Sequence, residues 1–582
     1  MKGSWNASNI IHSSFSCLFL FLFNFRDVCA APTRYSCRSE QRDALLEFKN
    51  EFEIGELSFY CISGYPKRLD LSCSCLHGRF RSNSSLFRLQ NLHFLDLSLN
   101  DLSGHIPSSV GNLSHLTTLH LSDNHFSGYI PFSIGNLSQL ISLGLSQNTF
   151  SGQIPSSIGN LSQLTYLHFF TNNFMGEIPS SFGNLNRLMR LSMFSNKLYG
   201  NFPSALLKMT RLSTLILSSN KFTGTLPPNI TSLSNLAFFD ASDNALSGTL
   251  PSSLFTIPSL TSIDLSDNQL EGTLEFGNTS SPPNLQALRI GGNNFIGPIP
   301  SSISKLTNLE ELNLSSFNTQ GPVDFSKVPS FICALRSLNI LDLSKNNFNG
   351  SIPHCLGNFK SSLSVLNLRH NRLSGGLPEN MLGNLRSLDV GHNQLTGKLP
   401  RSSIRMSSPL EVLNVESNRI NDTFPFWLSS LQSLQVLVLG SNSFHGPIHH
   451  QVSFPKLRII DVSRNHFNGS LPTSYFAKWI SILKIYTALD FSGNELEGEI
   501  PRSIGLLKEI HVLNLSNNGF TGHMPSSLGN MTALESLDVS RNKLSGEIPQ
   551  ELGNLSFLAY MNFSHNQLVG LVPGGTQFRR QN

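Results

Sequence analysis

A repeat of 24 residues constrains this chain more than any other feature of its sequence. The clearest copy, residues 113–136, reads LSHLTTLHLSDNHFSGYIPFSIGN, and the common frame is LxxLxLSxNxLSGxIP. The asparagine of this frame recurs at a constant step of 24, at positions 100, 124, 148, 172, 196, 220, 244 and 268. A period held through these copies predicts a repeat architecture, so the chain must be interpreted as one stacked array.

Each LxL segment of the frame predicts a short β-strand. Successive side chains of a strand point to opposite faces, so the leucines point inward and the residues between them point outward. The repeated asparagine, called the ladder asparagine below, has an amide that can pair buried backbone groups at the turn. We expect the SGxIP phrase to bend the chain and the SSIGNL phrase to return it as a helical or 3₁₀ turn. The sequence predicts an α/β solenoid of about 20 coils.

The ladder continues through the second half of the chain. Its later members are Asn293, Asn346, Asn371, Asn393, Asn418, Asn442, Asn465, Asn494, Asn518, Asn542 and Asn566. In LNLSSFN (312–318), Phe317 takes the ladder position, and we expect Asn318 to compensate by shifting in by one residue. A second irregular stretch, YFAKWISILKIY (475–486), precedes four regular repeats.

The first 30 residues have the pattern of a secretory signal peptide. Lys2 precedes the apolar stretch FSCLFLFLFNF (15–25), and Val28, Cys29 and Ala30 offer small residues for cleavage. The alternative is a buried hydrophobic segment. Sequons for N-glycosylation support an extracellular chain. They include Asn83, Asn112, Asn136, Asn160, Asn229, Asn278, Asn349, Asn421, Asn468, Asn530 and Asn554.

Six cysteines follow the predicted cleavage site: Cys37, Cys61, Cys73, Cys75, Cys333 and Cys355. An even number in a secreted chain favours disulfides over metal or catalytic roles, although the sequence leaves their connectivity open. Cys333 and Cys355 lie about one repeat apart, so we predict a bridge between them on neighbouring coils.

The remaining segments define the expected domain order. Residues 31–65 do not repeat, and QRDALLEFKNEF (41–52) predicts an amphipathic helix that caps the first coil. Repeats are expected over 66–474, an interruption over 475–486, four closing repeats over 487–570 and a tail over 571–582. No second apolar run is long enough to cross a bilayer, so we expect the mature chain as given to be soluble.

The composition and motifs argue against catalysis. Charged residues make up 13% of the chain and the net charge is +4, without the basic footprint of a nucleic-acid-binding protein. Metalloprotease, P-loop, dinucleotide and kinase signatures are absent from the sequence. His445, His449 and His450 could suggest a metal site, but they fall in a turn where side chains scatter, so no metal or other cofactor is expected. A periodic column of aspartates is interpreted as structural: Asp96, Asp264, Asp342, Asp389, Asp461, Asp490 and Asp538.

Outward positions of four successive coils carry the best candidate binding surface. Aromatic side chains beside an arginine have the composition of binding hot spots, although drift of an unselected surface is the alternative. The predicted ligand-contacting residues are Tyr166, His168, Phe170, Arg190, Phe194, Ile216, Phe238 and Asp240. A second, weaker polar group is Arg369, His370, His392 and Glu416.

The repeat frame resembles the plant-specific class of extracellular leucine-rich repeats. The order of signal peptide, QRDALLEFK cap, long array, interruption, four repeats and LVPGGTQF (571–578) resembles plant receptor-like proteins of the disease-resistance type. The resemblance implies a right-handed horseshoe of 24-residue repeats with a parallel β-sheet on the concave face. Three features depart from the family pattern. The cap lacks the usual tryptophan and paired cysteines, the interruption is short, and the sequence stops at Asn582, before a membrane helix.

The resemblance also implies a function. Such proteins are non-enzymatic and kinase-less receptors at the extracellular face of the plasma membrane, anchored by a single membrane helix. We expect a peptide, protein or glycan ligand on the concave face, and signalling in defence or development through receptor kinases that dock on the closing repeats (Asn494 to Asn566). A chain that truly ends at Asn582 would be secreted. A secreted inhibitor of microbial wall-degrading enzymes and a truncated, non-functional receptor remnant remain as alternatives.

Overall fold

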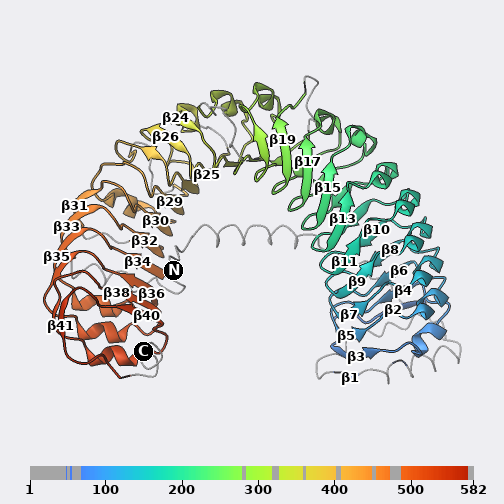
Figure 1. The fold of residues 1–582 in the computed structure, drawn as a ribbon, viewed down its shortest axis with the longest axis horizontal. Helices are drawn as coiled ribbons and strands as arrows, with labels where there is room; N and C mark the ends of the chain where they lie inside the picture. Colours follow the sequence, from blue (N-terminus) through green and yellow to red (C-terminus); the bar gives the residue numbers. More distant parts are fainter. Residues whose placement is uncertain are drawn as a thin grey trace.

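The computed structural model of the chain describes residues 67–277, 284–317, 327–357, 362–401, 408–448, 454–471 and 487–574, with Phe48 and strand β1 (Glu53–Ile54). The coils stack one on the next along an arc (Figure 1). The predicted solenoid of leucine-rich repeats is confirmed, with a long parallel sheet, the main sheet, on its concave face. The boundaries predicted for the cap and the interruption lie largely outside the described residues.

Each coil contributes one short strand to the main sheet, because its LxL segment alternates inward and outward side chains. The central residue of the strand, such as Leu95 or Leu167, is buried, and each strand pairs in parallel with the next coil. The strands are β2 (Arg68–Asp70), β4 (Phe94–Asp96), β6 (Thr118–His120), β8 (Ser142–Gly144), β10 (Tyr166–His168), β12 (Arg190–Ser192), β14 (Thr214–Ile216), β16 (Phe238–Asp240), β18 (Ser262–Asp264), β20 (Ala287–Arg289), β22 (Glu311–Asn313), β23 (Ile340–Asp342), β25 (Val365–Asn367), β27 (Ser387–Asp389), β29 (Val412–Asn414), β30 (Val436–Val438), β32 (Ile459–Asp461), β34 (Thr487–Asp490), β36 (Ile510–Asn514), β38 (Ser536–Asp538) and β40 (Tyr560–Asn562).

A second set of parallel strands follows the ladder asparagines, where the sequence predicted only a bend. The prediction was incomplete because these residues, the glycine included, also pair with the coils on either side: in β9, Thr149 and Phe150 pair with the preceding coil and residues 151–153 with the next. Gly152, for example, has a φ of +77°, and the ring of Tyr129 from the preceding coil fills the space where a side chain would stand. These strands are β3 (Leu76–Phe80), β5 (Asp101–Gly104), β7 (His125–Gly128), β9 (Thr149–Gln153), β11 (Asn173–Gly176), β13 (Lys197–Asn201), β15 (Lys221–Thr225), β17 (Ala245–Thr249), β19 (Gln269–Thr273), β21 (Asn294–Ile296), β24 (Asn349–Ser351), β26 (Arg372–Gly375), β28 (Gln394–Leu395), β31 (His445–Pro447), β33 (His466–Ser470), β35 (Glu495–Glu499), β37 (Gly519–Thr521), β39 (Ser545–Glu547) and β41 (Gln567–Val569).

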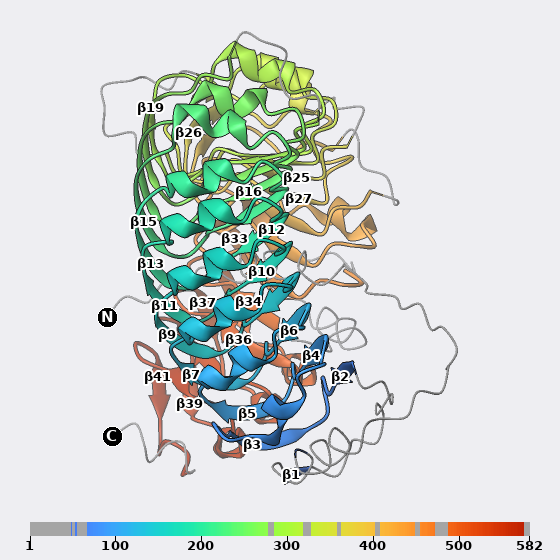
Figure 2. The same ribbon diagram turned by 90° about the vertical axis from the view of Figure 1, so that its right-hand side faces the viewer.

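Short 3₁₀ helices return the chain between the two sets of strands (Figure 2). Most of them begin directly after a proline, which stands at the N-cap; Pro155 before η4, for example, has an extended backbone with a ψ of 136°. They are η1 (Ser85–Arg88), η2 (Ser108–Asn112), η3 (Phe132–Asn136), η4 (Ser156–Asn160), η5 (Ser180–Asn184), η6 (Ser204–Lys208), η7 (Pro228–Ser232), η8 (Ser252–Thr256), η9 (Ser301–Lys305), η10 (Ser330–Ala334), η11 (His354–Leu356), η12 (Phe426–Ser430), η13 (Arg502–Leu506), η14 (Ser526–Asn530) and η15 (Gln550–Asn554).

The ladder asparagine joins each coil to the preceding one. Asn148 is buried, and its Nδ2 donates to the carbonyl of Leu121 in the preceding coil at 2.9 Å and to Ser146 in its own turn at 3.0 Å. Its Oδ1 accepts from the backbone N–H of Phe126, also in the preceding coil, at 2.9 Å. The amide therefore satisfies backbone groups that would otherwise be buried and unpaired, as the sequence predicted.

Phe317 interrupts this ladder. Its side chain is buried and packs edge-on against Phe295, with ring centroids 5.5 Å apart, where other coils have an amide. The backbone N–H of Phe317 donates to Asn346 Oδ1 at 3.2 Å, so the ladder resumes with the following coil. The predicted compensation by Asn318 falls outside the described residues.

The described part of the N-terminal segment is small. Phe48, inside the predicted cap helix, is helical and 2% exposed, and β1 pairs antiparallel with β3 at the edge of the second set of strands. Among the helices of the described residues, none combines the length and apolar character needed to cross a membrane.

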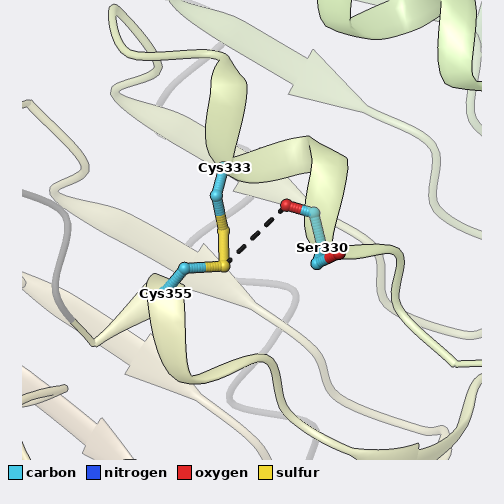
Figure 3. Close-up of a disulfide and its surroundings, with 3 residues drawn as sticks. All are labelled: Ser330, Cys333 and Cys355. Atoms are coloured by element: carbon cyan, nitrogen blue, oxygen red, sulfur yellow. Dashed lines mark hydrogen bonds between the residues drawn. A yellow bond between two sulfur atoms is a disulfide. The ribbon is translucent and has the colours of Figure 1, made fainter.

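A disulfide links two neighbouring coils in the second half of the chain. Cys333 in η10 is bonded to Cys355 in η11, with Cα atoms 6.1 Å apart (Figure 3). The sulfur of Cys355 also lies 3.9 Å from the carbonyl oxygen of Ser330. The bridge joins the two cysteines that the repeat spacing singled out.

We predict that Asn148→Ala lowers the free energy of unfolding by about 3 kcal/mol, because it leaves several buried backbone groups without partners. Urea unfolding followed by circular dichroism measures this loss. Asn186→Ala, at an exposed position of the same region, is the control and should change stability by less than about 0.5 kcal/mol. Equal stability of the two variants would contradict the role given to the ladder.

Candidate functional site

The eight predicted ligand-contacting residues lie together on the main sheet. Strands β10, β12, β14 and β16 pair in register, which places Tyr166 beside Arg190 and Ile216 beside Asp240. The residues between them, such as Leu191 and Phe239, are fully buried and hold the strands to the core. The surface is therefore built by rigid neighbouring strands and the turns that follow them.

Aromatic side chains form the centre of this surface. The rings of Phe170 and Phe194 stack with centroids 4.6 Å apart and planes 5° from parallel. Arg190 Cζ lies 5.9 Å from the ring centre of Tyr166. Tyr166 is 36% exposed, whereas both phenylalanines are half-buried rather than fully exposed. We call Tyr166, Phe170, Phe194, Ile216 and Phe238 the aromatic surface.

His168 contributes a neutral imidazole beside the aromatic surface. Its ring centre lies 6.3 Å from that of Phe170. Burial, together with the smaller effects of His120 and Arg190, lowers the pKa of His168 to about 4. The imidazole therefore stays uncharged near neutral pH, where it can donate one hydrogen bond and accept another.

Carboxyl groups gather next to the aromatic surface, on the following coils. Asp240 Oδ2 accepts from Ser218 Oγ at 2.8 Å, and Asp264 occupies the same position one coil later. Burial and the nearby Asp240 raise the pKa of Asp264 to about 6, although Arg289 lies 3.8 Å away. Asp264 was predicted to be structural only, and Asp243 and Asp267 were not predicted, although their 24-residue spacing is a signal visible in the sequence.

The second predicted group, on later coils, is an internally paired network. Arg369 is buried and donates to Glu416 at 2.7 Å, with Asp389 at 3.5 Å. His392 Nε2 lies 2.6 Å from Glu416 Oε1, and its ring stacks on His370 with centroids 4.2 Å apart. Burial, together with the smaller effects of His392 and Arg369, lowers the pKa of His370 to about 4. Because these charges pair with one another, the network offers less to a ligand than the aromatic surface does.

The column of aspartates has the hydrogen bonds of a structural element. In each aspartate, Oδ1 accepts a hydrogen bond of 2.8–3.0 Å from the backbone N–H of the residue two positions later in the chain. This bond fixes the turn after the strand. The acceptors are Asp96, Asp264, Asp342, Asp389, Asp461, Asp490 and Asp538. This geometry supports the structural interpretation.

One hydrogen-bonded chain on the first coils superficially resembles a hydrolytic triad. His120 Nδ1 lies 3.4 Å from Asp96 Oδ2, and His120 Nε2 lies 2.8 Å from Ser142 Oγ. A hydrolase also needs free N–H donors for the oxyanion. The N–H of Ser142 instead donates to the carbonyl of Thr117 at 3.1 Å, within the sheet. The N–H of Ser142 is therefore already paired and does not serve as such a donor.

Of the three histidines considered for a metal site, the structure describes only His445, which is not in a simple turn as predicted. His445 is exposed and lies in strand β31, because this coil too forms a strand after its ladder asparagine. His449 and His450 lie outside the described residues. Across the described ranges, no group of three or more histidine, cysteine, aspartate or glutamate side chains is arranged to hold a metal ion.

The candidate glycosylation sites that the structure describes lie off the main sheet. Asn112, Asn136, Asn160, Asn530 and Asn554 are each the last residue of a 3₁₀ helix and are exposed. Asn83, Asn229, Asn421 and Asn468 are also exposed, Asn349 is half-buried, and Asn278 lies outside the described residues. Glycans at these positions would leave the aromatic surface open.

Comparisons with known proteins agree with this architecture. Three family models match the chain. The model described as leucine-rich repeat region matches residues 133–324. A model described as leucine rich repeat matches residues 408–467 and 508–568, and another with the same description matches five segments between 91 and 405. Receptor-like protein 43 of Arabidopsis thaliana is 55% identical over 574 residues, covering 87% of this chain and 76% of that protein. The chain belongs to the plant leucine-rich-repeat receptor-like proteins. Receptor-like proteins 35 and 32 of Arabidopsis thaliana are 49% and 52% identical over 31% of this chain, and these matches span only 23% and 25% of their own lengths.

Solved receptor ectodomains resemble the chain over most of its length. The structure of PEPR1–AtPEP1 has a TM-score of 0.72 and 31% identity, covering 92% of this chain and 80% of that one. The plant peptide hormone receptor RGFR1 in complex with RGF2 has a TM-score of 0.69 and 32% identity, covering 86% and 82%. The Arabidopsis receptor kinase HAESA, in complex with the peptide hormone IDA and the co-receptor SERK1, has a TM-score of 0.63 and 29% identity, covering 92% and 99%.

We predict that Asp264→Asn stabilises the chain at pH 7.5 by about 2–3 kcal/mol and has little effect at pH 4. The folded-state pKa, about 6, lies above the ordinary value of 3.8. The folded chain therefore holds the proton more tightly, and stability falls as the pH rises from about 4 to 6. The variant removes this loss and keeps the oxygen that accepts from Ser266. Urea unfolding at the two pH values measures the difference.

Asp538→Asn is the matched control for this prediction. Asp538 makes the same bond to the backbone, but its neighbours on the sheet are Asn514 and Asn562 rather than a carboxylate. A stabilisation of the same size and pH dependence in both variants would contradict the effect attributed to Asp240.

Proposed function

We propose that the chain is the recognition part of a plant receptor-like protein and binds an extracellular peptide on the aromatic surface. The observation that carries this proposal is the stacked pair Phe170 and Phe194, flanked by Tyr166 and Arg190 on a rigid sheet. Rigid aromatic and arginine side chains contribute much of the energy at binding surfaces. The resemblance to ectodomains solved with peptide ligands supports a peptide as the ligand class.

Recruitment of a partner receptor kinase is the second part of the proposal. The receptor HAESA was solved together with a co-receptor, which supports assembly of this kind for the fold. We assign docking to the closing repeats, where Phe557 is 65% and Tyr560 51% exposed. Signalling in defence or development would then pass through the partner at the extracellular face of the membrane. Catalysis by the chain itself plays no part in this function.

We predict that Phe170→Ala/Phe194→Ala abolishes ligand binding, because it removes the centre of the aromatic surface. The purified secreted chain is screened with peptide fractions from plant extracellular fluid, and binding is measured as a rise in the melting temperature. Ligand that binds only the folded chain stabilises it by mass action. A fraction that stabilises the wild type should give no rise with the double variant, whose secretion and own melting should change little.

Phe132→Ala is the control, since Phe132 is 69% exposed at the start of η3, away from the main sheet. This variant should keep the full ligand-induced rise. The same rise in the double variant and the wild type would exclude the aromatic surface as the binding site.

A further inference from the structure

The coils that follow the aromatic surface carry an uneven distribution of charge on the main sheet. Asp240 and Asp264 lie on β16 and β18, and Asp243 and Asp267 lie in the turns three residues after them. We call these four residues the acidic surface. Asp243 and Asp267 are exposed, and Asp240 and Asp264 are half-buried.

The neighbouring cation does not neutralise this surface. Arg289, on the next strand β20, donates from Nε to Glu311 Oε1 at 2.6 Å and from Nη2 to Glu311 Oε2, whereas its Nη1 lies 3.8 Å from Asp264. The guanidinium therefore pairs chiefly with Glu311. Across β16, β18, β20 and β22, Arg289 is the one basic side chain.

Asp264 reports the resulting electrostatic environment. The groups that face it are Asp240 of β16, Ser266 of its own turn and Arg289 of β20. Burial and Asp240 raise its pKa to about 6 despite the arginine. A positive charge placed above Asp240 and Asp264 would therefore relieve a repulsion that the folded chain otherwise retains.

The aromatic and acidic surfaces are continuous. Ile216 pairs with Asp240 and Asp240 with Asp264 on successive strands, so one ligand can contact both surfaces without leaving the sheet. Phe194 lies two coils before Asp240, and Ile216 lies two coils before Asp264. A separation of two coils corresponds to roughly 10 Å at the usual strand spacing. An extended peptide covers this distance in about three residues.

Resting on the proposed function, we propose that this continuous surface binds a peptide with an apolar side chain and a cationic side chain about three residues away. The apolar side chain lies on Phe170, Phe194 and Ile216, where water is displaced from aromatic and aliphatic groups. The cationic side chain lies between Asp240 and Asp264, with Asp243 and Asp267 beside it. Charge complementarity thus selects basic over acidic peptides.

The test uses synthetic peptides and the purified full chain. The probe is a fluorescein-labelled seven-residue peptide with phenylalanine at its second position and arginine at its fifth and sixth. Two matched peptides replace the arginines by glutamates or the phenylalanine by glycine. We expect fluorescence anisotropy to show at least about tenfold tighter binding of the probe than of either matched peptide, equivalent to about 1.4 kcal/mol.

Charge-removing variants locate the cationic contact. Asp240→Asn/Asp264→Asn should weaken binding of the probe about tenfold. The control Asp490→Asn/Asp538→Asn changes the same strand position in the closing repeats and should leave the affinity within about twofold. All four aspartates accept a backbone N–H through Oδ1, which asparagine retains, so melting temperatures should confirm that both variants fold.

Three results would overturn the inference: no measurable binding of the probe, equal binding of the basic and acidic peptides, or equal losses in the two double variants. These outcomes leave the proposed function open to its own test. A natural peptide fraction that stabilises the wild type and both aspartate variants, but not Phe170→Ala/Phe194→Ala, would retain the receptor function and reject the basic ligand. Failure of all fractions on the wild type would count against the receptor function itself.

Discussion

The side-chain amide of one asparagine per coil is the interaction on which the rest of the structure depends. A solenoid coil is too small to pair its own backbone groups at the turn, and the amide supplies donors and an acceptor there. Because Asn148 bonds to Leu121 and Phe126 of the preceding coil, the same group that closes its own turn also fixes its coil against the preceding one. The main sheet, its register and the surface it presents follow from this repeated link.

Regularity in the sequence made the scaffold predictable. The 24-residue period identified the strands, the inward leucines and the ladder, since each of these depends on contacts that every coil repeats. The second set of strands was missed because Ser-Gly-x-Ile-Pro has the composition of a turn. The pairing of residues such as Thr149 and Phe150 with the preceding coil depends on the stacking of whole coils, which local composition does not express.

The candidate site was predictable only in part. Outward positions could be assigned from the strand pattern, so Tyr166, Phe170 and Phe194 were found without a structure. Their stacking and their half-burial depend on the twist between strands and on side-chain rotamers. The carboxyl groups had a sequence signal in the spacing of Asp243 and Asp267, but the effect of Asp240 on Asp264 required the distances between them.

The replacement of one ladder asparagine by Phe317 has a consequence for how stability is distributed. In an array whose coils contact only their neighbours, cooperativity passes through each interface in turn. The interface between the coils of Asn293 and Phe317 has a ring contact in place of the amide link, whereas Cys333 and Cys355 covalently join coils just beyond it. This interface therefore depends on the pairing of β20 with β22 and on the ring contact, and we expect cooperativity along the array to be weaker here than at interfaces that keep the amide link.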